Sequence, residues 1–285
     1  MRDSVNDNNT PRFYGEEIEP GRFKFGENWA NFLATLDSKR IENATKHLAD
    51  MLGHTDLSGM SFLDIGCGSG LFSLSAMRMN ARTVHSFDYD PESVRCTQYL
   101  REKFFPNTDK WTIERGDVLN SAYIGSLGTY DVVYSWGVLH HTGNMWKALE
   151  NATMTVSTGD LFIAIYNDQG RMSRFWYIVK KTYVRLPSWA QPLFVAIFLP
   201  RFEGPAMVKN ILKGKFPWSH FNEYYLSRGM SRWHDIKDWI GGFPFEVAKP
   251  EEIFDFFRIK GFTLKRLVTC GGGLGNNEFV FKRIS

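Results

Sequence analysis

The sequence predicts an α/β protein built on a Rossmann-like, seven-stranded and mainly parallel sheet with an antiparallel final strand. Two observations lead to this prediction. Apolar runs alternate with segments of helical spacing between residues 61 and 166, and such alternation favours a parallel sheet. The first run, 61–65, passes into a loop with glycine at 66, 68 and 70 and then into helix-forming residues. Strand, glycine-rich turn and helix in this order are typical of a nucleotide-binding domain.

Each further element has a local signal. Apolar residues keep helical spacing from Trp29 to Leu52, which predicts one or two helices before the sheet. Pro250 and the two acids after it predict a helix over 250–259. The glycine-rich stretch 271–277 predicts an antiparallel pair at the end of the chain. The other expected elements are strands near 83–88, 111–115, 131–136, 160–166, 262–269 and 278–283, and helices over 91–104 and 144–156.

Three acidic residues are expected at the carboxyl ends of the first three strands. Asp64 stands two residues before Gly66, where it would repel a pyrophosphate, and the spacing of the glycines is tighter than in the dinucleotide fingerprint. Asp88 ends the second strand, where an acid can accept hydrogen bonds from ribose hydroxyls. Asp117 follows the third strand. Three carboxylates around a glycine loop predict an adenosine ligand that carries a positive charge.

With these motifs the chain resembles the class I S-adenosylmethionine-dependent methyltransferases. "LDIGCGSG" (63–70) corresponds to their first motif, "FDYDP" (87–91) to their ribose-binding acid and "RGDVL" (115–119) to their adenine-edge loop. The resemblance is strong over about 55–166 and continues in general pattern over 250–285. It implies a methyltransferase that uses S-adenosyl-L-methionine as its cofactor.

The resemblance also implies roles for individual residues. Asp64 would face the methionine ammonium group, and Gly66 and Gly68 would line the amino-acid part of the cofactor. Asp88 would hold the ribose, and Tyr89 would flank the adenine. The implied cofactor-binding set is Asp64, Gly66, Cys67, Gly68, Gly70, Asp88, Tyr89, Asp117, Val118 and Ser135.

His140 and His141 follow the fourth strand, at the edge where ligands of such sheets bind. Methyl transfer requires an aligned acceptor and usually removal of its proton, and an imidazole with an unperturbed pKa of about 6.5 suits that task. Similar small-molecule methyltransferases of quinone and sugar biosynthesis carry "LHH" or "LEH" here. Either histidine is a candidate base. Tyr166 opens a second loop expected to contact the acceptor.

The acceptor is expected to be a small or lipid-linked metabolite, methylated at a hydroxyl. Residues 135–138 differ from the N/D-P-P-Y/F motif of the members that methylate the amino groups of bases. An RNA-modifying enzyme that uses a basic insertion is one alternative, and a non-catalytic S-adenosylmethionine-binding subunit is another.

The chain divides into four parts: an N-terminal arm with helices over 1–54, a cofactor-binding core over 55–166, an insertion over 167–249, and the C-terminal part of the core over 250–285. The insertion holds 13 Lys and Arg against 6 Asp and Glu, and five of the nine tryptophans. It is expected to be a mostly helical lid over the acceptor.

Within the insertion, residues 186–200 carry no charge and are flanked by lysines and arginines. A buried lid helix, a peripheral membrane contact through 186–215 and a dimer contact are all consistent with this pattern. Nucleic acid is not expected as a partner, because the net charge of +7 is modest for the length of the insertion. The oligomeric state is left open.

Composition excludes several other classes. The three cysteines, at 67, 96 and 270, lack the paired spacing of a disulfide framework or a zinc site. Asp168 alone is insufficient for a metal-dependent site, so no metal is expected. The N-terminus is polar and has no apolar signal stretch, which predicts a cytoplasmic protein. No apolar stretch reaches the roughly 18–20 residues that span a bilayer.

Overall fold

The computed structural model of this protein describes residues 22–23, 25–217 and 232–284. Its sheet has the strand order β3-β2-β1-β4-β5-β7-β6. β1 to β5 pair in parallel, and β7 runs antiparallel to both of its neighbours. The predicted seven-stranded sheet with an antiparallel final strand is therefore confirmed. The strands are β1 (Ser61–Ile65), β2 (Thr83–Asp88), β3 (Trp111–Arg115), β4 (Tyr130–Trp136), β5 (Val156–Tyr166), β6 (Phe262–Val268) and β7 (Asn276–Arg283).

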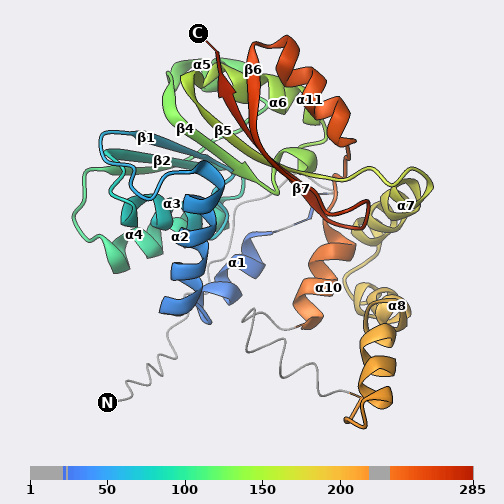
Figure 1. Ribbon diagram of the computed structural model, residues 1–285. Coiled ribbons are helices and arrows are strands. Elements are labelled where there is room, and N and C mark those ends of the chain that lie inside the picture. The colour runs from blue at the N-terminus through green and yellow to red at the C-terminus, as the bar shows by residue number, and fades with distance from the viewer. Residues whose placement is uncertain (1–21, 24, 218–231, 285) are drawn as a thin grey trace.

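Helices cover both faces of the sheet (Figure 1). Successive strand residues point to opposite faces, so that Leu63 packs into one apolar cluster and Phe62 into the other. The first cluster joins the sheet to α5 (Ser121–Ser126), α6 (Met145–Met154) and α11 (Pro250–Ile259). The second joins it to α2 (Ser38–Leu52), α3 (Leu71–Arg78) and α4 (Pro91–Phe104). Both faces are covered at the centre of the sheet, where all five residues of β1 are buried.

Side chains at the helix starts explain where the helices begin. The Asp90 carboxylate accepts a hydrogen bond from the Glu92 amide, 2.9 Å away, and Pro91 occupies the first turn of α4. At α11, the Glu252 carboxylate accepts from the Lys249 amide at 2.8 Å, and Pro250 opens the helix. The predicted boundaries 91–104 and 250–259 agree with both helices.

The described part of the insertion is mostly helical. It comprises α7 (Arg171–Arg185), α8 (Gln191–Leu212) and α10 (Arg232–Gly241), which pack around an apolar cluster of their own. α1 (Gly26–Leu33) and these three helices lie on the side of the sheet where the parallel strands end (Figure 1). The loose arm expected over 1–20 lies outside the described residues.

Two elements differ from the sequence predictions. β5 begins at Val156 and not near 160, and the preceding helix ends at Met154. Val156 pairs with Tyr130 before a register shift, and Gly159 lets the strands approach, since a Cβ there would lie 2.2 Å from the Asp131 carbonyl oxygen. No bounds were predicted for the short α5, although the Asn120 side chain caps it by accepting from two backbone amides.

Candidate active site

A cavity of about 470 Å³ lies beyond the carboxyl ends of β1, β2 and β4, where ligands of open α/β sheets bind. This volume is within the range of roughly 300–1,000 Å³ that is usual for small-molecule sites. Gly70, Ser135 and His140 are not among its lining residues. The predicted cofactor-binding residues that line it are Asp64, Gly66, Cys67, Gly68, Asp88, Tyr89, Asp117 and Val118.

Two glycines of the loop after β1 have backbones that a larger residue would strain. Gly66 has φ +75° and Gly68 has φ +54°, in the left-handed region that favours glycine. A Cβ on Gly66 would lie 2.3 Å from the Val138 side chain, and one on Gly68 would lie 3.0 Å from the Trp29 ring. Gly66 and Gly68 both line the cavity, and without side chains they let a ligand approach the main chain closely.

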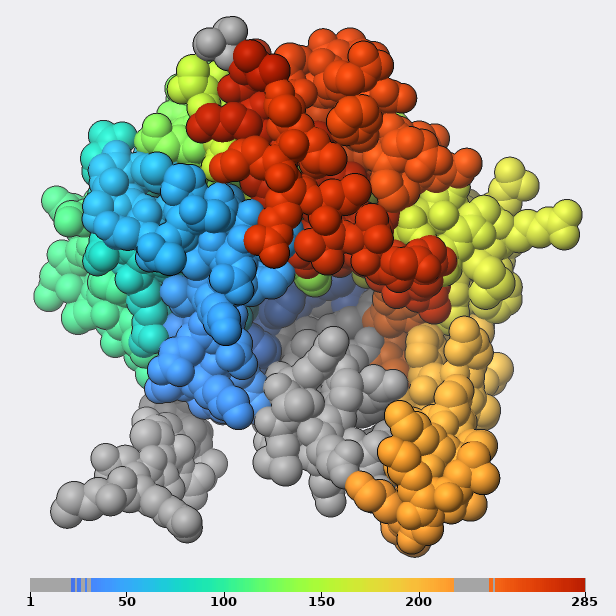
Figure 2. Space-filling model, in the orientation of Figure 1, coloured from blue at the N-terminus to red at the C-terminus, as the bar shows by residue number. Residues whose placement is uncertain are grey.

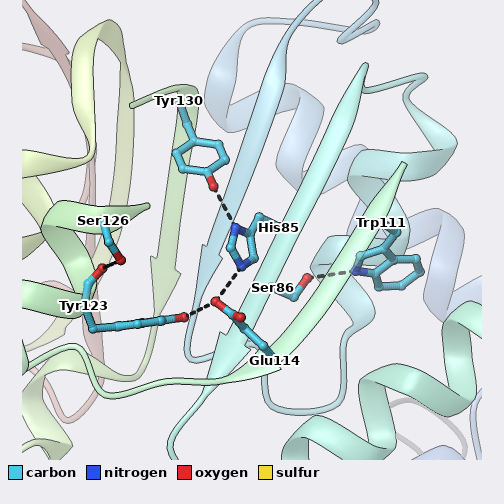
Figure 3. A network of polar contacts seen from close by, with 7 residues as sticks. All are labelled: His85, Ser86, Trp111, Glu114, Tyr123, Ser126 and Tyr130. Atoms are coloured by element: carbon cyan, nitrogen blue, oxygen red, sulfur yellow. Dashed lines mark hydrogen bonds and ion pairs between the residues drawn. The ribbon is translucent and has the colours of Figure 1, made fainter. Parts of the chain in front are cut away.

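Asp64 is a buried carboxylate at the cavity wall. The Ser73 hydroxyl donates a hydrogen bond to it, and Ser73 also contacts the Ser86 hydroxyl at 2.7 Å. The Trp111 indole donates to Ser86 at 2.8 Å, which fixes this group (Figure 3). Burial raises the pKa of Asp64 to about 7. A cation in the cavity would favour the ionised form, so Asp64 suits a positively charged ligand.

Asp88 ends β2 and is held by backbone donors. Its carboxylate accepts from the Gly68 amide at 2.9 Å and from the Asp90 amide at 2.8 Å. Desolvation nevertheless raises the pKa of Asp88 to about 7. The contact with Gly68 joins the acid of the second strand to the loop of the first. Ribose hydroxyls, which donate hydrogen bonds, are suitable ligands for a carboxylate in this position.

The loop after β3 is braced by a polar network (Figure 3). A Cβ on Gly116 would lie 2.5 Å from the Tyr123 ring, so only glycine fits beside that ring. The Tyr123 hydroxyl donates to Glu114 at 2.6 Å. Glu114 lies 3.0 Å from one ring nitrogen of His85, whose other nitrogen lies 2.7 Å from the Tyr130 hydroxyl. The network fixes α5 against the loop that carries Asp117 into the cavity.

His141 lies at the end of the short 3₁₀ turn η1 (Leu139–His141) and lines the cavity. Its Nδ1 is 2.6 Å from the Pro244 carbonyl oxygen. A carbonyl only accepts, so Nδ1 carries the hydrogen and Nε2 keeps a free lone pair. Burial, with a smaller effect of the Lys180 ammonium, lowers the pKa of His141 to about 3. The ring is therefore neutral at physiological pH and can accept a proton.

His140 has a different environment. It is fully buried, and its ring packs 4.0 Å from the Tyr166 ring and 4.5 Å from the His141 ring. Neither ring nitrogen has a well-formed hydrogen bond to the described part of the chain. Burial lowers the pKa of His140 well below its usual value. The geometry gives His140 a packing role behind Tyr166 and His141, and brings only His141 to the cavity.

The N-terminal segment extends across the cavity and joins its walls. The Phe23 amide donates to the Phe243 carbonyl oxygen at 2.9 Å, which connects the segment to the insertion. The Arg22 guanidinium donates to the Thr142 carbonyl oxygen at 2.8 Å. The Gly26 amide donates to the Asp90 carboxylate at 2.9 Å. The lining residues that it contributes are Arg22, Phe23, Phe25, Trp29 and Phe32.

The insertion supplies aromatic wall residues that no local motif singled out. Trp239, Phe243 and Pro244 line the cavity beside Tyr166, which the sequence placed in an acceptor loop. The only sequence signal for them is the aromatic excess of the insertion. Their rings make the part of the cavity beyond the acids apolar, so a planar apolar molecule fits there.

Gly70 and Ser135 support the cavity from outside it. Gly70 caps α3 with φ +79°, and a Cβ there would meet Thr97 at 2.8 Å. The Ser135 hydroxyl donates to the Ile65 carbonyl oxygen at 2.9 Å, which ties β4 to the end of β1. Cys67 lines the cavity as a buried thiol whose pKa burial raises.

Two other kinds of feature are absent from the part of the chain that the structure describes. Within residues 22–23, 25–217 and 232–284, no three His, Cys, Asp or Glu side chains come together as ligands for a metal. In the same ranges, no helix has both the length and the apolar character needed to cross a bilayer.

Comparison with known proteins supports the resemblance. Residues 63–159 match a methyltransferase domain family. The chain is 28% identical over 144 residues to a ubiquinone biosynthesis O-methyltransferase of Methylobacterium sp. (strain 4-46), a match that covers 48% of this chain and 53% of the relative. It is 37% identical over 59 residues to a ribosomal protein L11 methyltransferase of Psychrobacter sp. (strain PRwf-1), covering 21% of this chain and 19% of the relative. The chain thus spans about half the length of the first relative.

Solved structures share the fold at low identity. The magnesium protoporphyrin IX methyltransferase of Synechocystis PCC 6803, solved with bound SAH, superposes with a TM-score of 0.51 at 14% identity, over 86% of this chain and 84% of that one. An O-methyltransferase family protein of Burkholderia thailandensis gives a TM-score of 0.52 at 12% identity, over 92% of this chain and 59% of that one.

The domain match, the strand order and the acid-lined cavity agree with one another. The glycine loop, Asp64 and Asp88 fit the cationic adenosine cofactor that the motifs imply. The chain therefore carries a methyltransferase domain over residues 63–159, with the fold of the class I enzymes, and its cofactor is S-adenosylmethionine.

Proposed function

We propose that this protein transfers a methyl group to the hydroxyl of a small or lipid-linked metabolite, with His141 as the general base. The observation that carries the proposal is the position of His141. Its Nδ1 is engaged by Pro244, and its ring lines the same cavity as Asp64 and Asp88. When bound, S-adenosylmethionine supplies a methyl group activated by a positively charged sulfur.

The residues of the chain have separate tasks in this proposal. Asp64 offers negative charge to the cationic end of the cofactor, and Asp88 accepts from its ribose. His141 takes the proton of the acceptor hydroxyl on Nε2 as that oxygen gains the methyl group. The aromatic walls orient the acceptor and exclude water.

The lowered pKa of His141 bears on the class of acceptor. An imidazole with a pKa of about 3 is a weak base, so it assists an acidic hydroxyl better than an alkyl alcohol. A phenol has an acidic hydroxyl and a planar ring that packs on the walls from Tyr166, Trp239 and Phe243. We therefore infer a phenolic acceptor. The relative named for ubiquinone biosynthesis, an O-methyltransferase, supports methylation at oxygen.

The test is to incubate the protein with labelled methyl donor and a metabolite extract and to identify labelled products by mass spectrometry. We expect a methylated phenol. His141→Gln should then lose roughly 10²–10⁴-fold in turnover while cofactor affinity, measured by calorimetry, persists.

His140→Gln is the matched control. It changes a neighbouring imidazole that does not line the cavity, so turnover should fall much less than in His141→Gln once folding is confirmed by thermal melting. Equal losses in both variants, or full activity of His141→Gln, would contradict the assignment of the base. Labelled RNA in the absence of any labelled metabolite would favour the RNA-modifying alternative.

A further inference from the structure

The outer face of α8 is an unusual surface within the described chain. Seven large apolar side chains on α8 and beside its ends are more than half exposed, with Ile197 at 71% and Leu212 at 83%. We call these residues, together with the basic residues next to them, the α8 face. The apolar members are Trp189, Leu193, Ile197, Val208, Ile211, Leu212 and Phe216, and the basic members are Arg201, Lys209, Lys213 and Lys215.

The opposite side of α8 is already packed. Val195 is buried, and Phe194, Phe198 and Phe202 contact the apolar cluster that α7 and α10 share. The expected buried lid helix is therefore buried on one side only. The apolar residues of the α8 face are not needed for that packing, since they point away from it. They form two groups, one before Pro200 and one after Pro205, and several large apolar side chains exposed along one helix are typical of an interaction site.

The charges of the segment all have one sign at the surface. Residues 186–217 contain a single acid, Glu203, and it is 3% exposed. The four basic residues of the α8 face are exposed. Apolar side chains with only cations among them match an anionic lipid surface, where the rings and alkyl groups enter the interface and the cations meet the headgroups.

The position of α8 in the molecule also favours this partner. Figure 2 shows α8 projecting from the body of the molecule, so a flat surface can reach it. A helix that lies in the plane of a membrane interface needs such access along its length, because its apolar side chains enter the lipid while its axis stays at the surface. We propose that the α8 face binds the surface of a membrane that contains anionic lipids.

The consequence concerns access to the cavity, and this step rests on the proposed function. Trp239 lines the cavity, and its ring lies 5.9 Å from that of Trp176 in the cluster that also holds α8. A membrane-bound α8 therefore brings the apolar wall of the cavity close to the lipid. The acceptor expected there is an amphiphile whose phenolic ring carries a lipid tail.

The experiment is flotation of the full chain with vesicles of phosphatidylcholine, either alone or with a third of phosphatidylglycerol. We expect flotation with the anionic vesicles, little with the neutral ones, and loss of binding at high salt. The double variant Leu193→Glu/Ile197→Glu should bind at least about tenfold more weakly. The charge variant Lys209→Glu/Lys213→Glu should lose binding to a similar degree.

Ile259→Glu is the matched control, because Ile259 is 76% exposed on α11 and lies outside the α8 face. It should float like the parent, and all variants should keep their cofactor affinity. A parent that does not float with anionic vesicles, or α8 variants that float like the parent, would overturn the proposal. Binding of single-stranded RNA that competes fully with the vesicles would assign the face to nucleic acid instead. Flotation needs no turnover, so this result stands apart from the test of the methyl acceptor.

Discussion

At the scale of single residues, the cavity depends on two carboxylates that water does not solvate well. Asp64 is held by the Ser73 hydroxyl, and Asp88 is held by two backbone amides. In both cases burial outweighs these hydrogen bonds, so that each pKa is raised to about 7. Ionisation of these acids at neutral pH is thus coupled to the arrival of a cationic ligand.

This coupling predicts that cofactor affinity depends on pH. Below about pH 7 the free protein holds both carboxyls protonated, whereas the bound form requires carboxylates. Affinity for S-adenosylmethionine should therefore rise through pH 7 and level off near pH 8, and binding at pH 6 should release protons. Calorimetry at several pH values, in buffers of different ionisation enthalpy, measures both effects.

The stability of the free protein should follow the opposite course. A carboxyl whose pKa rises from 3.8 to about 7 on folding contributes stability that is complete below about pH 4 and lost as the pH rises through 7.

The variant Asp88→Asn tests the pH dependence of cofactor affinity. It removes one titrating group, so the slope of the logarithm of affinity against pH should fall by about one proton. An affinity that is the same at pH 6 and pH 8 would show that the two acids do not control binding.

The sequence predicted which residue types form the site better than it predicted their orientation. Asp64 and Asp88 could be placed because the ends of parallel strands meet at one edge. His140 and His141 could not be distinguished, because adjacent residues of a 3₁₀ turn point about 120° apart and the partner of His141 is Pro244, far along the chain. Only the fold shows which ring reaches the cavity.

At the scale of elements, the position of the loop after β3 depends on the packing of α5. Tyr123 from α5 fills the space beside Gly116, and Glu114 fixes the hydroxyl of that tyrosine. The bounds of α5 could not be predicted because it is a six-residue helix, too short for a periodic apolar pattern. The start of β5 was missed because Ser157 and Thr158 are exposed and polar, and they lie at the register shift between the Val156–Tyr130 and Asp160–Val132 pairs.

Gly116→Ala should therefore destabilise the protein and weaken cofactor binding. The added methyl group would overlap the Tyr123 ring, and forcing extra atoms into a packed site costs about 1–3 kcal/mol. Thermal melting gives the loss of stability, and calorimetry gives the loss of affinity.

The matched control is Gly125→Ala, inside α5, where a Cβ would make an ordinary contact with Met154 at 3.5 Å. Alanine is a better helix former than glycine by roughly 0.5–1 kcal/mol, so this variant should melt at the same or a higher temperature. If Gly116→Ala melts and binds like the parent, the loop does not depend on its fit to Tyr123.

At the scale of the whole molecule, three apolar clusters each hold a different part of the fold together. Two of them bind helices to the two faces of the sheet, and the third holds the insertion together. The cavity lies where the sheet edge, the N-terminal segment and the insertion meet. The motifs in the sequence predicted the sheet edge, but the other two walls come from long-range contacts, such as that of Phe23 with Phe243, for which a local motif gives no signal.

This division of the walls predicts that the insertion controls the acceptor and not the cofactor. Trp239 lines the cavity and packs on Tyr166, with 5.3 Å between the ring centres, whereas the acids and the glycine loop belong to the sheet edge. Trp239→Leu replaces a large wall residue with a smaller one and should lower kcat/KM for the phenolic acceptor by roughly 10–200-fold, the range that is usual when an apolar pocket fits its substrate less closely. Trp189→Leu, in the same insertion but 74% exposed, should leave kcat/KM unchanged with an acceptor in free solution. Cofactor affinity should stay within a few-fold of the parent in both variants. A Trp239→Leu protein that binds the cofactor poorly and still methylates its acceptor at the parent rate would place the cofactor, and not the acceptor, against the insertion.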